Sequence, residues 1–322
     1  MKVGIDTSPL HQTRAGTARH LRGLLGALEG RPDLELVGLS AGGTGRLATI
    51  RRDAVWYPYR LGSAAARLDL LHCPTFRGPR RPRTPLVVTV HDLAVIRHPD
   101  AFPLWHRVTG RRALVASVRV ADAVVAVSDF TRDELVAELD VPAERIRVVP
   151  NGVEAVFSPD GPTAGGDYAV AVGTLEPRKN LARVVEAARL AGIELRVAGM
   201  KGWGGSRVAG WVGEPTDDEL AALYRGARCL VYPSLYEGFG IPILEAMACG
   251  TPVVTSRGGA TEEIAGGAAV LVDPWDATSI ADGLAEAVRR RDELVPRGLA
   301  RAACFTWERA GDEVETLWRE LL

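Results

Sequence analysis

The chain has 322 residues, of which 47% are hydrophobic and 25% charged, and its formal net charge is −1. This length is too great for one ordinary hydrophobic core, so the sequence favours two domains. No apolar run reaches the roughly 18–20 residues that a transmembrane helix needs, which argues against a membrane span. Basic residues are in excess in the first half and acidic ones in the second. This asymmetry fits either an anionic partner of the first half or a solvated surface without such a role.

In the first half, short β-branched segments alternate with helical patterns, which predicts βαβ units around a parallel sheet. The chain opens directly on a core strand, where a signal peptide would have a different pattern. Leucines recur at helical spacing in 17–29 and form one apolar stripe. Strands are expected at 2–6, 34–40, 85–92, 123–128 and 146–151.

The second half repeats this rhythm after a segment rich in Pro and Gly, 158–167, which is the expected linker. Strands are expected at 168–173, 193–199, 229–234, 252–256 and 268–273. Helices are expected at 181–191, 217–227 and 242–249, with two more at the end of the chain. The sequence therefore predicts two doubly wound α/β domains, whose ligands bind beyond the carboxyl ends of the strands.

Adjacent cations follow the first strand of the second domain, in the stretch GTLEPRKN. Arg178 and Lys179 stand just before the next helix, whose N-terminus already favours an anion. An arginine fork beside a lysine point charge suits a diphosphate. The alternative is a pair of solvated charges in a turn.

Two glutamates flank a glycine-containing turn in EGFGIPILE. Gly238 and Gly240 let the backbone approach a ligand, and the amides around Phe239 point at it. Glu237 precedes this turn, and Glu245 is expected in the first turn of the helix that follows. Carboxylates accept hydrogen bonds from vicinal hydroxyls, so a sugar or ribose fits better than an anion. For Glu245 alone, the alternative is a favourable charge at a helix N-terminus.

Other common site types are disfavoured by the sequence. No Walker phosphate loop occurs, and the glycines at 42–47 do not match a dinucleotide fingerprint. No cluster with the spacing of metal ligands is present, so no metal is expected. The four cysteines are scattered, and three lie in or beside apolar runs, which predicts reduced, buried thiols in a cytoplasmic protein.

Both site stretches, together with VVTVHD, VAVSDFT, RIRVVPNGV and FTWERA in the same order, resemble the retaining GT-B glycosyltransferases of family 4, the glycosyl transferases group 1. The resemblance covers nearly the whole chain. It implies two Rossmann-like domains that face a central cleft. Residues 1–157 would form the acceptor-side domain and residues 168–305 would bind the nucleotide sugar. A helix at 306–322 would pack back on the first domain.

The resemblance also implies roles for the two site stretches. Arg178 and Lys179 would hold the diphosphate and stabilise its charge as it leaves. Glu245 would bind the ribose hydroxyls, while Glu237 and the amides of Gly238–Gly240 would bind the donor sugar.

Three further residues follow strands and enter the expected site by resemblance. His91, at the end of VVTVHD, would contact the donor sugar or its developing charge, although a lone histidine is as often structural. Gly173 would border the donor. Gly16 belongs to the family's glycine-containing loop near the phosphates, but the loop here keeps this glycine without the family's full glycine run.

These features predict a hexosyltransferase of polysaccharide biosynthesis that moves a hexose, with mannose favoured, from a GDP- or UDP-sugar to a glycan or lipid-linked acceptor. No cofactor and no catalytic metal are expected. Two alternatives stay open: an inactive sugar-nucleotide-binding partner subunit, which the intact Arg178, Lys179, Glu237 and Glu245 disfavour, and a GT-B nucleotide-sugar epimerase.

The basic excess gathers at 76–84 and 105–114. One hypothesis is that this surface meets anionic lipid at the inner face of the cell membrane or a phosphate-bearing acceptor. The alternative is solvated arginines, with Trp105 in the core. No RNA-binding motif accompanies these stretches, so no nucleic-acid partner is expected.

Overall fold

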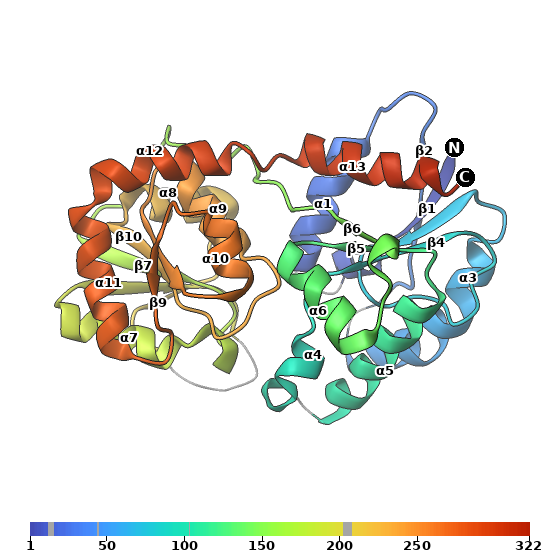
Figure 1. Cartoon of the computed structure of the whole chain (residues 1–322), viewed down its shortest axis with the longest axis horizontal. Coiled ribbons are helices and arrows are strands. Elements are labelled where there is room, and N and C mark those ends of the chain that lie inside the picture. The colour runs from blue at the N-terminus through green and yellow to red at the C-terminus, as the bar shows by residue number, and fades with distance from the viewer. Residues whose placement is uncertain (12–15, 44, 103, 202–207) are drawn as a thin grey trace. The chain divides into compact units, whose positions relative to one another are not determined.

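The computed structural model describes residues 1–11, 16–43, 45–102, 104–201 and 208–322. The chain divides into two compact units, Met1–Gly152 with Trp307–Leu322, and Val153–Thr306. Each unit contains a parallel sheet with helices packed around it (Figure 1). The expected pair of doubly wound α/β domains is therefore confirmed.

The segment expected as a linker, 158–167, lies within the second unit. The Ala164 amide donates to the Ala222 carbonyl at 2.9 Å. Arg225 Nε donates to the Pro162 carbonyl at 2.7 Å. These bonds fix an irregular, Pro- and Gly-rich backbone on a neighbouring helix, so the change of unit occurs earlier, between residues 152 and 153.

The sheet of the first unit has the order β2-β1-β3-β4-β5-β6. Its strands are β1 (Lys2–Asp6), β2 (Glu35–Leu39), β3 (Leu70–Cys73), β4 (Leu86–Val90), β5 (Ala123–Ala126) and β6 (Ile146–Val148). β3 was not expected, because four residues give too short a pattern to recognise. Strand order reverses between β1 and β3, which is where ligands bind in such sheets.

The helices of the first unit include one that comes from the far end of the chain. They are α1 (Gly16–Leu28), α2 (Arg46–Arg51), the π-helix η2 (Arg52–Arg60), α3 (Leu61–Ala64), α4 (Ala94–Arg97), α5 (Leu104–Val120), α6 (Asp129–Leu139) and α13 (Trp307–Glu320). The 3-10 segments are η1 (Ser8–His11), η3 (Pro99–Ala101) and η4 (Ala143–Arg145). The π-helix and the two short helices that flank it, at 46–64, were not expected.

Helix α13 packs beside α1 (Figure 1). A Cβ atom added to Gly23 would come within 2.0 Å of the Trp307 ring, so only glycine admits this indole. Trp318 is fully buried and Trp307 is 6% exposed. Both tryptophans thus anchor the terminal helix to the first unit.

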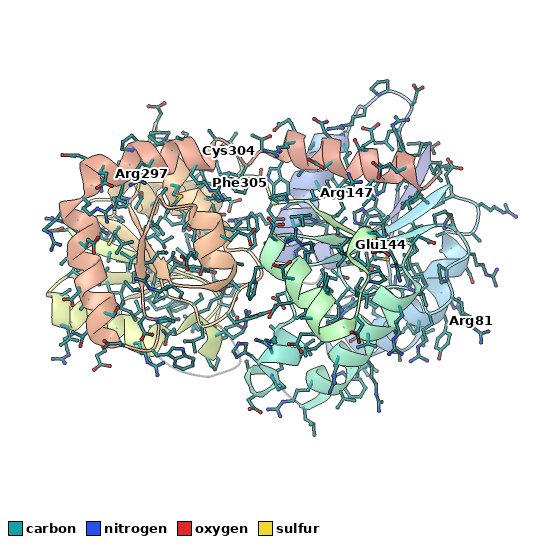
Figure 2. The ribbon with its side chains drawn as sticks, in the orientation of Figure 1. Arg81, Glu144, Arg147, Arg297, Cys304 and Phe305 are labelled. Carbon is teal, nitrogen blue, oxygen red and sulfur yellow. The ribbon has the colours of Figure 1, made fainter. Side chains whose placement is uncertain are left out.

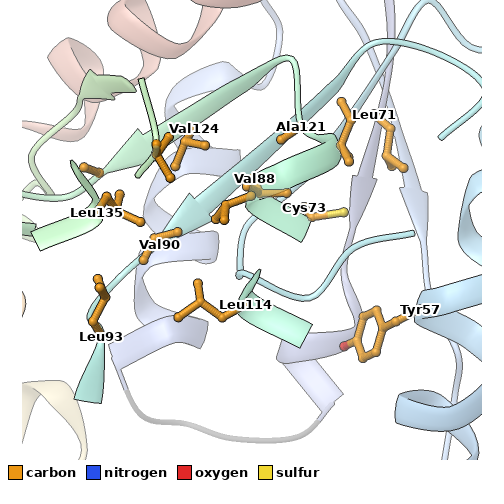
Figure 3. Close-up of a cluster of buried hydrophobic side chains, with 14 of the residues drawn as sticks. Tyr57, Leu71, Cys73, Val88, Val90, Leu93, Leu114, Ala121, Val124 and Leu135 are labelled. Carbon is orange, nitrogen blue, oxygen red and sulfur yellow. The ribbon is translucent and has the colours of Figure 1, made fainter. Parts of the chain in front are cut away.

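The core of the first unit on one face of the sheet joins strands β3, β4 and β5 to helices η2, α5 and α6. Figure 3 shows this cluster, with Val88, Leu114 and Leu135 among its buried side chains. Cys73 belongs to it, and Cys229 and Cys249 are also buried, as expected for three of the four cysteines. Cys304 is exposed (Figure 2).

Buried histidines make the first unit sensitive to acid. Burial lowers the pKa of His72 to about 3, and burial also lowers the pKa values of His20 and His91. The unfolded chain therefore binds protons more readily, and stability falls as the pH drops below about 6.5. Burial raises the pKa of Asp6 to about 6, which works in the opposite direction.

We expect the temperature of the unfolding midpoint to decrease when the pH is lowered from 7.5 to 4.5. Below pH 6.5, His72 should lower the free energy of unfolding by about 1.4 kcal/mol for each pH unit. Scanning calorimetry of the wild type and of His72→Gln measures this contribution. The variant should show a flatter pH dependence, whereas His11→Gln, at an exposed position, should change nothing. Equal slopes for His72→Gln and the wild type would contradict the prediction.

The sheet of the second unit has the order β12-β11-β10-β7-β8-β9. Its strands are β7 (Tyr168–Val172), β8 (Glu194–Ala198), β9 (Trp211–Gly213), β10 (Cys229–Tyr232), β11 (Val253–Ser256) and β12 (Val270–Val272). The three-residue β9 was not expected. β7 and β10 are parallel neighbours, and strand order reverses between them.

The helical segments of the second unit are η5 (Pro177–Lys179), α7 (Leu181–Ala191), α8 (Asp217–Gly226), α9 (Ile241–Ala248), α10 (Gly259–Ala265), α11 (Ala277–Arg289) and α12 (Arg291–Ala302). α7 has the expected bounds, and Gly192 ends it in the left-handed conformation. The expectation of two terminal helices was wrong, because α11, α12 and α13 all follow β12. Among the described residues, no helix has both the length and the hydropathy to cross a membrane.

Candidate active site

The predicted site stretches of the second unit meet at the carboxyl ends of two adjacent strands. GTLEPRKN follows β7 and EGFG follows β10, and these strands pair in parallel through Cys229–Ala169 and Leu230–Val170. Parallel neighbours end at the same edge of the sheet, and here that edge is the reversal point of the strand order. The sheet thus brings the two stretches together, although Gly173 and Glu237 are 64 residues apart in the sequence.

Lys179 and Glu237 form an ion pair across this edge. Lys179 Nζ lies 2.5 Å from Glu237 Oε1, and the two side chains are 13% and 10% exposed. The Tyr232 hydroxyl accepts from Lys179 Nζ at 2.8 Å and donates to Glu237 Oε1 at 2.8 Å. These contacts hold an ammonium, a carboxylate and a phenol hydroxyl together at the carboxyl ends of β7 and β10.

The protonation states of this cluster follow from burial and pairing. Burial by itself lowers the pKa of Lys179, but the Glu237 carboxylate raises that pKa above its ordinary value. Burial likewise opposes ionisation of Glu237, yet Lys179 and Arg178 hold the pKa of this carboxyl below its usual range. Burial raises the pKa of Tyr232. At neutral pH the cluster therefore contains a charged lysine, a charged glutamate and a neutral phenol.

Arg178 is fixed beside this pair by the backbone and by a second carboxylate. Its Nη2 lies 2.6 Å from Glu176 Oε1, and its Nη1 donates to the Tyr236 carbonyl at 3.0 Å. Nη1 also lies 3.8 Å from Glu237 Oε2. The guanidinium is 12% exposed, so it presents a largely desolvated charge at the sheet edge.

Gly173 gives Lys179 the room to fold back. Its φ of +149° lies in the region that favours glycine, and a Cβ atom there would stand 3.2 Å from the aliphatic chain of Lys179. This glycine therefore shapes the cation site.

The turn after β10 leads directly into α9. Gly240 has a φ of +109° and precedes the first helical residue, which leaves the amides of Phe239 and Gly240 ahead of the helix. The Phe239 ring itself is buried in edge contact with Phe305, with ring centroids 6.1 Å apart. Phe239 can therefore serve a ligand only through its backbone. Gly238 stands between Glu237 and this amide group.

Glu245 differs from the expectation. α9 starts at Ile241, so Glu245 lies in the second turn and not in the first. It is 1% exposed, and its Oε2 accepts from the Tyr224 hydroxyl at 3.0 Å. Its carboxylate is thus bonded to α8, whereas that of Glu237 is bonded to Lys179.

A pair of variants separates ligand binding by Glu245 from its structural bond. Because hydrogen bonds to a charged group contribute about 1.5–3 kcal/mol, Glu245→Gln should raise the donor KM at least tenfold if the carboxylate binds the ribose. Tyr224→Phe removes only the structural bond, so it should lower stability by about 1 kcal/mol and leave the donor KM within about threefold. Steady-state kinetics and thermal unfolding of both variants measure this. Equal KM values for both would remove Glu245 from the ligand site.

His91 and Gly16 belong to the first unit. His91 follows β4, and its Nε2 donates to the Pro74 carbonyl at 2.9 Å. Burial lowers the pKa of His91, so the ring is neutral at pH 7. The ring meets His20 edge-on, with centroids 4.7 Å apart. Gly16 begins α1, and a Cβ atom there would meet open space, so this glycine is not required by packing.

A cavity of about 220 Å³ opens beside His91, lined also by Asp92, Thr75, Phe76 and Arg77. Thr75, Phe76 and Arg77 follow the unexpected strand β3, so sequence reasoning did not place them beside His91, whereas Asp92 follows β4 directly after His91. Sequence reasoning also missed Tyr232, although a polar side chain that ends the strand CLVY is a usable signal.

Most arginines of the basic stretches 76–84 and 105–114 are exposed. Trp105 is 53% exposed, so its placement in the core is wrong. Arg81 is exposed at the edge of the first unit (Figure 2). Within the described ranges, no group of three or more His, Cys, Asp or Glu side chains is arranged to hold a metal ion.

Comparison with known proteins matches both halves of the chain. The family model described as Glycosyltransferase Family 4 matches residues 16–157, and the model described as Glycosyl transferases group 1 matches residues 157–297. The O-antigen chain mannosyltransferase B of Escherichia coli is 34% identical over 272 residues, which cover 74% of this chain and 71% of that protein.

Solved structures share the whole fold. The sucrose-phosphate synthase of Thermosynechococcus elongatus aligns with a TM-score of 0.79 at 21% identity, covering 100% of this chain and 99% of the other. Anabaena HepE in complex with UDP and glucose aligns with a TM-score of 0.76 at 17% identity, covering 99% of each chain.

Proposed function

The chain belongs to the glycosyl transferases group 1 of glycosyltransferase family 4, and on this premise we propose that it transfers mannose from a nucleoside-diphosphate sugar to a hydroxyl of a glycan or lipid-linked acceptor, with retention of anomeric configuration. The choice of mannose is supported by the similarity to the O-antigen chain mannosyltransferase. The observation that carries the donor site is the buried Lys179–Glu237 pair at the ends of β7 and β10.

When the donor binds, the ion pair between Lys179 and Glu237 separates, and each side chain contacts a different part of the donor. The diphosphate replaces Glu237 as the counterion of Lys179, and Arg178 lies close enough to share the second phosphate. Both cations are already desolvated, so each stabilises the charge that develops on the leaving diphosphate more strongly than it would in water. Glu237, released from Lys179, accepts hydrogen bonds from the hydroxyls of the donor sugar.

Tyr232 keeps Glu237 in place during this exchange, since its hydroxyl donates to the same carboxylate oxygen that Lys179 contacts. The amides ahead of α9 add donors for the sugar or phosphate oxygens. Charge stabilisation thus comes from Arg178, Lys179 and backbone amides, and the proposed reaction uses no catalytic metal.

A thermal-shift series with UDP, GDP, ADP and dTDP, each at millimolar concentration, tests the donor site. A nucleotide at about 100 times its Kd adds roughly 2.7 kcal/mol of stability. One nucleotide that raises the midpoint by several degrees would name the base of the donor. No shift with any of the four would contradict a nucleotide-sugar donor site and favour an inactive subunit.

Product analysis distinguishes transfer from epimerisation. With the matching nucleotide sugar and no acceptor, a transferase gives at most slow hydrolysis to the free sugar and the nucleoside diphosphate. An epimerase instead converts the donor into a second nucleotide sugar. The appearance of that product, detected by chromatography, would replace the proposed activity.

Peripheral contact with anionic lipid also stays a proposal. Leu104, Trp105 and Val108 at the start of α5 are 74%, 53% and 41% exposed, and the last two lie in the basic stretch 105–114. Apolar and basic side chains on one surface suit an anionic bilayer. Sedimentation with phosphatidylglycerol vesicles at low salt should capture the protein, and the variant Trp105→Ser should reduce capture. Equal sedimentation with and without vesicles would contradict this contact.

A further inference from the structure

Asn180 connects three loops at the carboxyl edge of the second sheet. It follows Lys179 directly, in the loop after β7, and it is 4% exposed. Its Nδ2 donates to the Pro233 carbonyl at 3.0 Å and to the Pro274 carbonyl at 2.6 Å. Pro233 comes directly after β10, and Pro274 comes two residues after β12. One buried amide group thus joins the chain segments that follow three different strands.

The side chain of Asn180 does not cap the helix that it precedes. An asparagine before a helix usually has an extended backbone and accepts from amides of the first turn. Asn180 instead has a φ of +58°, in the left-handed region, which asparagine tolerates better than most residues. Among the described residues, no amide of the first turn of α7 donates to its side chain. Its side chain therefore serves the loops and not the helix.

The partners of Asn180 also fix the direction of its amide group. Its Oδ1 accepts from Arg183 Nη1 at 2.9 Å. A guanidinium can only donate, and a proline carbonyl can only accept, so Nδ2 must face the two prolines. Each of the two bonds to the loops therefore depends on the amide group, and a carboxylate of the same shape could form neither.

A backbone contact on the other side of Lys179 joins the same two loops. The Leu235 amide donates to the Arg178 carbonyl at 2.8 Å. Lys179 thus lies between two residues that are both bonded to the loop after β10, and Glu237 lies in that loop two residues after Leu235. The position of the Lys179 ammonium beside the Glu237 carboxylate depends on these contacts.

We propose that Asn180 is a positioning residue, which joins the loops after β7, β10 and β12 and thereby fixes Lys179 against Glu237. Asn180 is uncharged and acts through these two side chains. The proposal rests on the proposed donor site and deepens it, since it names the residue that orders the ion pair before the donor binds. A site that is already ordered loses less conformational entropy on binding.

Two variants remove the bonds that the amide group donates. Asn180→Gly deletes the side chain but keeps the left-handed backbone without strain. Asn180→Asp keeps the shape of the side chain and turns an acceptor oxygen towards the two carbonyl groups. In both variants the loops are less tightly joined, so Lys179 should spend less time beside Glu237. Because burial raises the pKa of Glu237 and Lys179 lowers it, this pKa should rise.

Titration of the glutamate carboxyl groups by ¹³C NMR measures this pKa on the full chain without a ligand, and Glu237→Gln assigns the signal. We expect the pKa of Glu237 to rise by about one unit or more in both variants, a tenfold change in its proton affinity. Isothermal titration with GDP and with UDP gives a second measurement. Whichever nucleotide binds the wild type should bind both variants about tenfold more weakly, because the loops must then be ordered on binding.

Val184→Ala is the matched control for a loss of stability alone. Val184 is fully buried in α7, so its truncation weakens the core of the second unit and leaves the side chain of Asn180 in place. This variant should unfold at a lower temperature but keep the pKa of Glu237 and the nucleotide affinity of the wild type.

Two results would overturn the proposal. One is an Asn180→Gly protein that has the Glu237 pKa and the nucleotide affinity of the wild type. The other is an equal change of both quantities in Asn180→Gly and Val184→Ala, which would limit Asn180 to a role in stability. A wild type that binds neither nucleotide would count against the proposed donor site, whereas the titration of Glu237 would still test Asn180.

Discussion

Replacing Lys179 with alanine is expected to lower the rate of sugar transfer by a factor of about 10²–10³, the usual cost of removing one charge-stabilising contact in a transition state. The ammonium is buried and close to Glu237 and Tyr232. Its charge therefore acts in a medium of low polarity, where it stabilises a leaving diphosphate more than an exposed lysine could. Initial rates with saturating donor and acceptor measure the loss.

The same substitution should also shift the titration of Glu237. Burial raises the pKa of Glu237, and Lys179 and Arg178 lower it. Without Lys179 only Arg178, at 3.8 Å, still counters burial, so the pKa of Glu237 should rise. The residual activity should then depend on pH in a range where that of the wild type is constant. Arg189→Ala, at an exposed position of α7, is the matched control and should keep full activity. Lys179→Ala with wild-type rates would remove this lysine from the mechanism.

The meeting of Arg178, Lys179 and Glu237 at one edge of the second sheet could be predicted from sequence, because it depends on local patterns. Gly173, Arg178 and Glu237 stand directly after recognisable strands, and carboxyl strand ends are where α/β sheets bind ligands. Which cation faces which carboxylate could not be predicted. It depends on β10 lying beside β7 in the sheet, although β8 and β9 come between them in the sequence.

Glu245 shows where local reasoning fails. Its position in α9 depends on the helix starting at Ile241, one residue before the proline that was taken as the start. Helix ends are commonly uncertain by one or two residues, and here that difference moves a carboxylate to the second turn and against Tyr224. The cavity of the first unit was missed for a related reason, since Thr75, Phe76 and Arg77 in its lining follow the four-residue β3.

Gly199→Ala is expected to destabilise the second unit by on the order of 3–5 kcal/mol, from backbone strain and overpacking together. Gly199 has a φ of +144°, and an added Cβ atom would lie 2.0 Å from the Gly173 carbonyl oxygen. The neighbouring Gly173 amide donates to the Ala198 carbonyl at 3.0 Å. A methyl group here must therefore push apart the two chain segments that end β7 and β8.

Because Gly173 borders Lys179, the same displacement reaches the proposed donor site. Gly199→Ala should thus lower the unfolding midpoint, by roughly 2–4 °C per kcal/mol, and also weaken the thermal shift produced by the nucleotide. Gly192→Ala is the control, since Gly192 has a φ of +64° in open space and its substitution should cost only about 1–2 kcal/mol. Its nucleotide shift should equal that of the wild type. A Gly199→Ala protein that unfolds like Gly192→Ala and keeps the wild-type nucleotide shift would contradict both the predicted loss of stability and the link to Lys179.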